Sequence, residues 1–362
     1  MRLHIAQLAP PFETVPPSGY GGTERVVSTL TEELVRRGHD VTLFAAAGSR
    51  TEARFEPIVP KALWHCQPPC NDFVRHQSQI YARISRQLDQ FDIVHSHLDF
   101  MGFGLAQSPH RPIVSTIHGT LEARASWHRY HAYADLPLVS ISDAQRAPLA
   151  RANWIATVHH GIELDDFTFN PRPSGYLAFL GRISPEKGVD VAIRVARRVG
   201  LPIKIAARPP LPFSDSPECQ RDRAYFETRV EPLLAEPGVE LIGEIGGADK
   251  DRFLGDASAL LFPIRWREPF GLVMPEALAC GTPVVAFRDG SVPEVIEHGV
   301  TGFIGHVEDD LVEAVERLSE IDRYRCHARA KQRFSPQAMA DRYEQVYVRL
   351  LERTPALVHA FA

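Results

Sequence analysis

The stretch REPFGLVMPEALACGTPVV (Arg267–Val285) carries the most specific pattern in this chain of 362 residues. It predicts a helix that Pro269 can start and Gly281 can end, because proline favours the first helical turn and glycine the position after the last. Glu268 precedes this helix and Glu276 follows about two turns into it, which places the two carboxylates on the order of 10 Å apart along the axis. A strand expected over residues 283–287 follows, so the stretch is a helix–strand unit of an α/β fold.

The separation of the two carboxylates indicates what the stretch can bind. It suits one carboxylate on a sugar and the other on a ribose, with phosphates between them at the N–H groups of Phe270, Gly271 and Leu272. Two carboxylates that cooperate as in a glycosidase would lie much closer together. The structural alternative is that Glu268 caps the helix and Glu276 faces solvent.

A second loop, GRISPEKG (residues 181–188), follows directly after a predicted strand. Arg182 and Lys187 lie within it, and two cations at a strand end can neutralise a diphosphate, each charge-assisted bond contributing about 1.5–3 kcal/mol. A solvated basic loop is the alternative. The position at the end of a strand favours binding.

A third loop, GYGGTER (residues 19–25), joins the first predicted strand to the first helix. Gly21 and Gly22 allow close approach of a ligand, and the helix N-terminus behind them suits phosphate. A tight turn explains the glycines equally well. The dinucleotide fingerprint G-x-G-x-x-G fails because position 24 is Glu24, and the chain contains no phosphate-binding loop ending in Gly-Lys-Ser/Thr.

Short apolar runs alternate with amphipathic segments along the chain, which is typical of βα units around parallel sheets. The polar, proline-containing stretch DDFTFNPRPS (Asp165–Ser174) interrupts this alternation. The sequence therefore predicts two doubly wound, Rossmann-like domains, with ligands at the carboxyl ends of the strands that face a central cleft. The expected segments are an N-terminal domain over 1–165, a linker over 166–174, a C-terminal domain over 175–334 and a last helical segment over 335–362.

Composition excludes several classes of protein. With 40 basic and 45 acidic side chains the net charge is −5, which argues against a nucleic-acid partner bound through a broad basic surface. Five cysteines, an odd number, do not indicate a disulfide framework and favour a reducing compartment. Apolar runs stay short of the about 18 residues of a membrane span, and the start MRLHIAQLAPP lacks the features of a signal peptide. We expect a soluble, cytoplasmic protein with no integral membrane segment.

Four motifs occur in a fixed order: G-G-x-E at 21–24, T-I-H-G at Thr116–Gly119, G-R-x-x-x-E-K-G at 181–188, and E-x(7)-E at Glu268–Glu276. Together they resemble the retaining family 4 glycosyltransferases (glycosyl transferases group 1) of the GT-B fold. The resemblance extends from Gly21 to Gly302. It implies transfer of a sugar from a nucleotide-diphosphate donor, with retention of anomeric configuration, in the cleft between the two domains.

The same resemblance implies roles for individual residues. Arg182 and Lys187 hold the diphosphate, Glu276 takes the ribose hydroxyls, Glu268 contacts the donor sugar, the Phe270–Leu272 amides support it, Gly21 and Gly22 approach the phosphates, and His118 lies beside the reacting sugar. The last helix is expected to pack back on the N-terminal domain. One departure concerns Arg208-Pro209-Pro210, where many relatives carry a glycine-bearing turn. We expect Arg208 to add a third cation near the phosphates, with capping of a reshaped loop as the alternative.

Cations and helix N–H groups can stabilise a departing diphosphate in place of a metal, so no metal and no other cofactor are expected. The D-x-D at Asp249–Asp251 opens a helix and is interpreted as capping. His65, Cys66 and Cys70 form H-C-x-x-x-C without a second ligand pair at zinc-finger spacing. His97 ends a strand and is a candidate for the acceptor side, against the alternative of a hydrogen-bonded histidine within the fold.

The leading hypothesis is a retaining, metal-independent hexosyltransferase that uses a nucleotide sugar, with UDP favoured over GDP and ADP. A GT-B-fold epimerase or phosphorylase would need an acid/base pair or a pyridoxal-phosphate lysine, for which the sequence shows no motif. A nucleotide-sugar-binding protein without turnover is the third possibility. The loops expected to choose the acceptor lie at Cys66–Phe73, Leu98–Gly104 and Leu121–Tyr130, and their composition does not specify what the acceptor is. The sequence does not specify the oligomeric state either.

Overall fold

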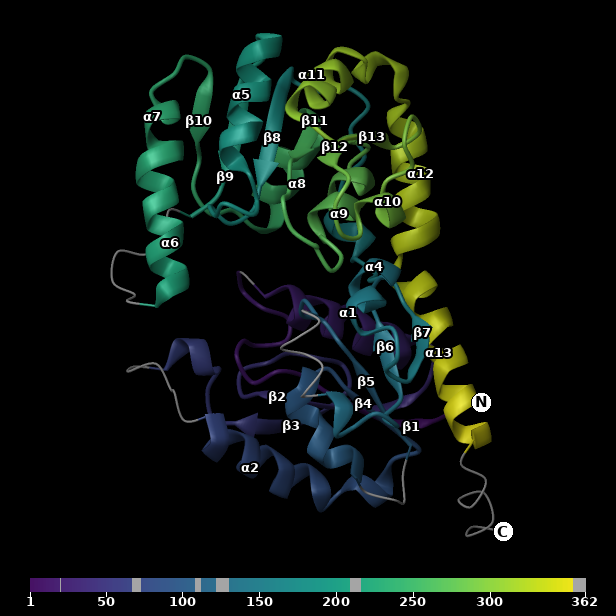
Figure 1. The fold of residues 1–362 in the computed structure, drawn as a ribbon. Helices are drawn as coiled ribbons and strands as arrows, with labels where there is room; N and C mark the ends of the chain where they lie inside the picture. The colour runs from purple at the N-terminus through teal and green to yellow at the C-terminus, as the bar shows by residue number, and fades with distance from the viewer. Residues whose placement is uncertain (20, 67–72, 108–111, 122–129, 209–215, 354–362) are drawn as a thin grey trace. The chain divides into compact units, whose positions relative to one another are not determined.

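The computed structural model describes residues 1–19, 21–66, 73–107, 112–121, 130–208 and 216–353. The chain divides into two compact units. Figure 1 colours the chain by residue number, from purple at the N-terminus to yellow at the C-terminus. Unit 1 comprises Met1–Gly161 and Pro336–Ala362, and unit 2 comprises Ile162–Ser335. Each unit is built on a parallel sheet with helices around it, which confirms the predicted α/β class.

The described residues of unit 1 form a seven-stranded sheet in the order β3-β2-β1-β4-β5-β6-β7. Its strands are β1 (His4–Leu8), β2 (Asp40–Ala46), β3 (Arg54–Val59), β4 (Ile93–Ser96), β5 (Ile113–Thr116), β6 (Leu138–Ser140) and β7 (Trp154–Thr157). The helices are α1 (Gly22–Arg36), α2 (Phe73–Ser85), α4 (Asp143–Arg146) and α13 (Pro336–Arg353). All pairings are parallel, and Gln7 of β1 lies opposite His95 of β4.

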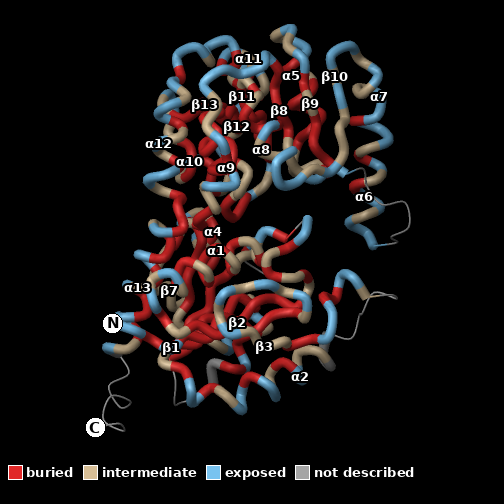
Figure 2. Tube along the Cα trace, turned by 180° about the vertical axis from the view of Figure 1, so that it is seen from behind, coloured by how far each residue is buried: buried red, intermediate tan, exposed pale blue. Residues whose placement is uncertain are grey.

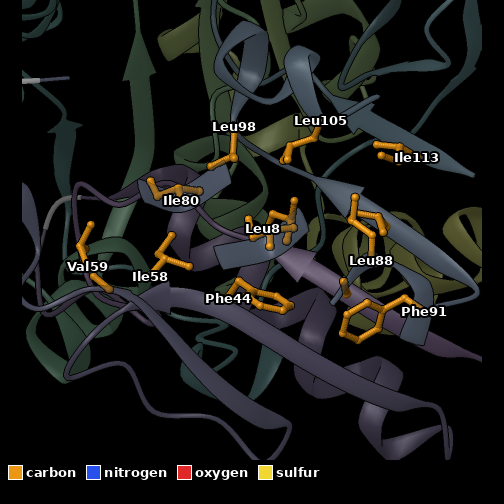
Figure 3. Packing of buried hydrophobic residues seen from close by; sticks show 14 of the residues in the cluster. Leu8, Phe44, Ile58, Val59, Ile80, Leu88, Phe91, Leu98, Leu105 and Ile113 are labelled. Carbon is orange, nitrogen blue, oxygen red and sulfur yellow. The ribbon is translucent and has the colours of Figure 1, made fainter. Parts of the chain in front are cut away.

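The inner strands of unit 1 are buried on both faces, as near-continuous apolar runs predict for a parallel sheet, whereas the edge strands β3 and β7 are only partly buried (Figure 2). Figure 3 shows the cluster on one side of this sheet, where Leu8 and Phe44 of the strands meet Ile80 and Leu88 from the segment that covers them. Burial of such side chains contributes about 1.5–3 kcal/mol each. This packing fixes the strand ends that position the site.

The C-terminal helix α13 belongs to unit 1 and packs against α1. Arg37, just after α1, donates to Asp341 at 2.7 Å and to Glu344 at 2.6 Å, and the ring of His39 lies 2.8 Å from the second oxygen of Glu344. Tyr343 and Tyr347 on the inner face of α13 are fully buried. The last helix therefore supplies polar groups to the interior of unit 1.

The described part of unit 2 forms a six-stranded parallel sheet in the order β10-β9-β8-β11-β12-β13. Its strands are β8 (Tyr176–Leu180), β9 (Ile203–Ala206), β10 (Val239–Leu241), β11 (Ala257–Phe262), β12 (Val284–Phe287) and β13 (Gly302–Gly305). The helices are α5 (Val189–Val199), α6 (Pro217–Tyr225), α7 (Glu231–Leu234), α8 (Gly247–Gly255), α9 (Val273–Ala279), α10 (Val292–Val295), α11 (Glu308–Glu316) and α12 (Arg323–Phe334). Residues 166–174, expected as a linker, lie within unit 2, where the Asn170 side chain donates to Asp256 at 2.9 Å.

Strand order reverses once in each sheet, between β1 and β4 and between β8 and β11. In doubly wound sheets, ligands bind at the carboxyl ends of the strands on either side of this reversal. The loops after β1 and β4 and those after β8 and β11 contain most of the candidate site residues, whereas His118 follows β5, Arg208 follows β9 and Glu276 lies on α9. No helix within the described ranges is long and apolar enough to cross a membrane.

Candidate functional site

In unit 2, a buried ion pair joins the loops that follow β8 and β11. The Lys187 ammonium donates to Oε2 of Glu268, and only 19% and 10% of the two side chains are exposed. The indole N–H of Trp266 donates to the same oxygen at 2.9 Å, and the ammonium lies 4.8 Å from the centre of that ring. Two donors, one from each loop, therefore hold the Glu268 carboxylate in place.

Two glycines allow these loops to approach each other and their neighbours. Gly188, with φ +71°, is so close to the Pro263 carbonyl oxygen that a Cβ would collide with it. Gly290, with φ +51°, lies against the backbone of Glu268, and Ser291 donates from its amide to the Glu268 carbonyl at 3.0 Å. The loop after β12 thus supports Glu268 from behind, a feature that the Asp289-Gly290 turn dipeptide could have indicated in the sequence.

A second buried ion pair lies on α9. Lys250, from the first turns of α8, donates to Oε1 of Glu276 at 2.7 Å, and the side chains are 14% and 7% exposed. The D-x-D pattern draws attention to Asp249 and Asp251, whereas Lys250 between them carries no pattern of its own and was not predicted as a site residue. Since α9 begins at Val273, Glu276 lies in its first turn and Pro269 does not start the helix, so the predicted start was wrong.

Helix α9 begins later in the sequence than predicted because Phe270–Leu272 form a connecting turn ahead of it. The Phe270 ring is buried, and its carbonyl accepts from the Ser291 hydroxyl at 2.8 Å. Gly271 follows with φ +75°. The first N–H groups of a helix have no acceptor within it, so the turn ahead of Glu276 is suited to an anion.

Arg182 is held by acidic side chains. Its guanidinium donates to Glu186 at 2.7 Å and to Glu218 at 2.9 Å, and Asp222 lies 3.9 Å away. Partial burial lowers the pKa of Arg182, but these carboxylates outweigh it and leave the pKa above its usual value. A diphosphate would have to compete with them for Arg182, whereas Lys187 can keep Glu268 and still offer two N–H donors.

Arg208 follows β9 and is exposed, with its guanidinium 3.6 Å from Glu244. Pro209 and Pro210 lie outside the described residues. The role of Arg208 as a third cation stays a prediction.

In unit 1, His118 lies two residues beyond β5 in a buried polar cluster. The Asp99 carboxylate accepts the His118 backbone N–H at 2.8 Å, and the His97 ring accepts or donates at 2.9 Å to Nε2 of His118. The ring of His160 stacks on His118 with centroids 5.1 Å apart. Burial lowers the pKa of His118 to about 3, so its imidazole is neutral.

His97 is 1% exposed, and both its ring nitrogens are occupied, by His118 and by Gln7. This geometry favours a supporting role for His97 over direct contact with an acceptor. Gly21 precedes α1 and Gly22 is its first residue, as expected for a loop that opens onto a helix N-terminus.

The other metal-ligand candidates have ordinary partners. The His65 ring lies 2.6 Å from a Glu13 oxygen, the Cys66 thiol points to the Ala62 carbonyl, and Cys70 is outside the described residues. In the D-x-D, Asp249 pairs with Arg252 within α8, whereas Asp251 accepts the Thr168 N–H at 2.7 Å. The two aspartates therefore serve different partners.

Two family models match adjoining parts of the chain. The Glycosyltransferase Family 4 model matches residues 20–166, and the model for glycosyl transferases group 1 matches residues 163–333. The chain belongs to glycosyltransferase family 4. The two matches together cover every motif on which the resemblance was based.

Relatives and solved structures agree with this assignment. The D-inositol 3-phosphate glycosyltransferase of Mycolicibacterium smegmatis is 26% identical over 379 residues, covering 89% of this chain and 82% of that protein. AviGT4, a glycosyltransferase involved in avilamycin A biosynthesis, superposes with a TM-score of 0.73 at 24% identity, covering 97% and 98% of the two chains. Anabaena HepE in complex with UDP-glucose gives a TM-score of 0.72 at 17% identity, covering 96% and 100%. This family 4 glycosyltransferase has the GT-B fold.

Proposed function

We propose that this glycosyltransferase moves a hexose from a nucleotide-diphosphate sugar to an acceptor hydroxyl with retention, without a metal, and with UDP-sugars favoured. The observation that carries the proposal is the set of two buried lysine–carboxylate pairs, Lys187–Glu268 and Lys250–Glu276, at the carboxyl edge of the unit 2 sheet. Buried ion pairs are costly to desolvate, so retaining two at one edge favours a binding function.

In the proposed complex the diphosphate lies between the two carboxylates. Lys187 donates to it while it keeps Glu268, and the turn at Phe270–Leu272 offers backbone N–H groups. Glu276, held by Lys250, accepts from the ribose hydroxyls. Glu268, fixed by Trp266, accepts from a hydroxyl of the donor sugar, whose polar groups suit a carboxylate.

Arg182 joins this complex by exchanging a carboxylate for a phosphate oxygen. Its present partners, Glu186 and Glu218, are 15% and 58% exposed, so the contact with Glu218 is the cheaper one to give up. His118 beside the reacting sugar, which the family resemblance implies, completes the proposal.

The reaction step is a front-face substitution. The bond between the anomeric carbon and the diphosphate oxygen breaks, and its electron pair leaves with the nucleoside diphosphate. The acceptor oxygen bonds to the anomeric carbon on the same face, and its proton passes to the departing phosphate oxygen. Lys187 and Arg182 stabilise the charge that grows on that phosphate, the contribution expected to be largest in such a site.

Support for the UDP preference comes from HepE, which has been crystallised with UDP-glucose. The test is a panel of UDP-, GDP- and ADP-sugars, in which released nucleotide is followed with and without EDTA. Glu268→Gln is the informative variant. Glu240→Gln is the matched control. It alters an exposed carboxylate on the edge strand β10, which lies 3.8 Å from the Lys204 ammonium on β9.

We expect EDTA-resistant release from one nucleotide class, a loss of about 10²-fold in Glu268→Gln, and no change in Glu240→Gln. NMR of the product should give the anomeric configuration of the donor. Inverted product would refute retention, and activity lost in EDTA and restored by Mn²⁺ would refute metal independence. Binding of a donor without turnover with any acceptor would favour a non-catalytic protein.

A further inference from the structure

A continuous chain of side-chain hydrogen bonds crosses the interior of unit 1 from α13 to His118. Tyr347 on α13 contacts the Gln7 amide nitrogen at 3.2 Å, and the Gln7 amide oxygen lies 2.9 Å from Nε2 of His97. Nδ1 of His97 then lies 2.9 Å from Nε2 of His118. Three elements distant in sequence, β1, the end of β4 and α13, thus contribute to one relay that ends on the His118 ring.

A branch of the same chain begins at the Tyr347 hydroxyl. It lies 2.8 Å from Nδ1 of His95, and Nε2 of His95 lies 2.7 Å from the Thr116 hydroxyl. Thr116 in turn contacts the Tyr343 hydroxyl at 3.0 Å. Gln7, His95, Thr116 and both tyrosines are 0% exposed, so their hydrogen bonds are not exchanged with water.

The donor and the acceptor of each hydrogen bond in this relay can be assigned from the orientation of the Gln7 side-chain amide. Its amide oxygen can only accept, so Nε2 of His97 must carry a proton. In a neutral imidazole the other nitrogen is then an acceptor, so Nδ1 of His97 receives the proton of Nε2 of His118. The same reasoning leaves Nδ1 of His118 as a lone pair, and this buried atom has no hydrogen-bond partner among the described residues.

The branch agrees with this assignment. The Gln7 amide nitrogen donates to the Tyr347 oxygen, which leaves the tyrosine proton for Nδ1 of His95. His95 then carries its own proton on Nε2 and donates to Thr116. Each contact pairs one donor with one acceptor, so no group in the relay is left in conflict.

We propose that Gln7 and His97 are positioning residues that fix His118 in the tautomer protonated at Nε2, so that its Nδ1 is the acceptor offered to a hydroxyl group of a bound substrate. The inference rests on the proposed function only for the identity of that hydroxyl group, as one of the sugar or the acceptor. A buried acceptor without a partner is costly, and a bound hydroxyl relieves that cost.

The surroundings keep the relay neutral. Burial, with the nearby His118, lowers the pKa of His95 to about 3, and burial also holds the pKa of His97 well below its usual value. Among the described residues, the groups that face His118 are His97, His160 and Asp99. The Asp99 carboxylate accepts the backbone N–H of His118 and does not contact its ring, and burial raises the pKa of that carboxyl to about 6. The tautomer of His118 is therefore set by hydrogen bonds and not by a neighbouring charge.

The test reads the tautomer directly. Long-range ¹H–¹⁵N correlation spectra of the intact protein, labelled with ¹⁵N-histidine and assigned by single histidine substitutions, report which ring nitrogen carries the proton. We expect His95, His97 and His118 all to be protonated at Nε2, with no change between pH 8 and pH 5. His118 protonated at Nδ1, or present as an imidazolium, would overturn the inference.

Variants then test the positioning role. Gln7→Met removes the acceptor at nearly constant volume, and we expect mixed tautomers at His97 and His118 and a fall in kcat of about tenfold with donor KM within about twofold. Gln7→Glu restores an acceptor for His97 and should restore the tautomer. Tyr343→Phe is the matched control, because it removes a buried hydroxyl only at the far end of the branch.

An unchanged tautomer and unchanged kcat in Gln7→Met would refute the positioning role. The spectra require no donor, so they decide the inference even if no nucleotide sugar is turned over. In that case the proposed function alone would have failed.

Discussion

Replacing Gly290 with alanine would push a methyl group into the backbone that carries Glu268. The new Cβ would lie 2.9 Å from the carbonyl carbon of Arg267 and closer still to the amide nitrogen and oxygen of Glu268. Ordinary van der Waals contact begins at 3.4 Å, so the Glu268 backbone must move by about 1 Å. The carboxylate that pairs with Lys187 moves with it.

Two effects of this substitution can be separated. Alanine at a left-handed φ of +51° costs about 1–2 kcal/mol in backbone energy, which lowers the melting temperature of a domain of this size by roughly 2–8 °C. Displacing a substrate-positioning group by about 1 Å can cost on the order of 10²-fold in rate. We expect kcat/KM for the donor to fall by this second amount.

Gly200→Ala is the matched control. Gly200 ends α5 with φ +70°, and a Cβ there would meet nothing within 4 Å. This variant incurs the same backbone cost without touching a neighbour, so it should lose thermal stability and keep its activity. The assay is nucleotide release from the preferred donor, with thermal unfolding of both variants in parallel. If Gly290→Ala has a kcat/KM within about twofold of Gly200→Ala, the claim that Gly290 supports Glu268 is refuted.

Three further predictions concern buried charges. Lys250→Met leaves the Glu276 carboxylate, which is 7% exposed, without its ion-pair partner, and should lower the free energy of unfolding in urea by about 3–5 kcal/mol. The reasoning fails if adding Glu276→Gln to this variant recovers none of the lost stability. Burial, with a smaller contribution from Glu13, raises the pKa of Glu24 from 4.5 to about 7, so the folded state holds a proton that the unfolded chain has lost in this range. Stability should therefore fall between pH 5 and pH 7 by about 2 kcal/mol, and equal urea midpoints for Glu24→Gln and the unchanged protein at both pH values would contradict this. Arg323 donates to three backbone carbonyls and the Thr282 hydroxyl, so Arg323→Met should cost at least about 3 kcal/mol in thermal unfolding, and a loss below about 1 kcal/mol would be inconsistent with those bonds.

Much of the fold could be predicted because its elements have clear periodicity. The bounds of α5 (Val189–Val199) follow from the sequence, since its apolar residues recur at helical spacing and glycines stand on both sides. The elements that were missed lack such a signal. Strand β3 contains Pro57 and two charged residues, as an edge strand tolerates, and β13 is the short run Gly302–Gly305 with two glycines. Helix α12, RYRCHARAKQRF, is so rich in cations that its apolar face is only three buried residues wide, namely Cys326, Ala330 and Phe334.

The candidate site was predictable only in part. Lys187, Glu268 and Glu276 could be named because strand–loop–helix patterns place the first two in loops that follow strands and the third on the helix after such a loop. Lys250 and Gln7 could not, because a single lysine in a helix and a single glutamine in a strand carry no pattern of their own. Their importance depends on which buried group they contact.

The sequence by itself determined the alternation of strands and helices, the two doubly wound units and the loops that bear chemistry, because these depend on local periodicity and turn residues. The tertiary structure decided the partners: Lys187 with Glu268 across 81 residues, Arg182 among carboxylates, and Gln7 with Tyr347 across 340 residues. A charged or polar side chain takes its partner from whatever the order of strands brings to the same sheet edge. That order is set by packing of the whole unit, which local periodicity does not encode.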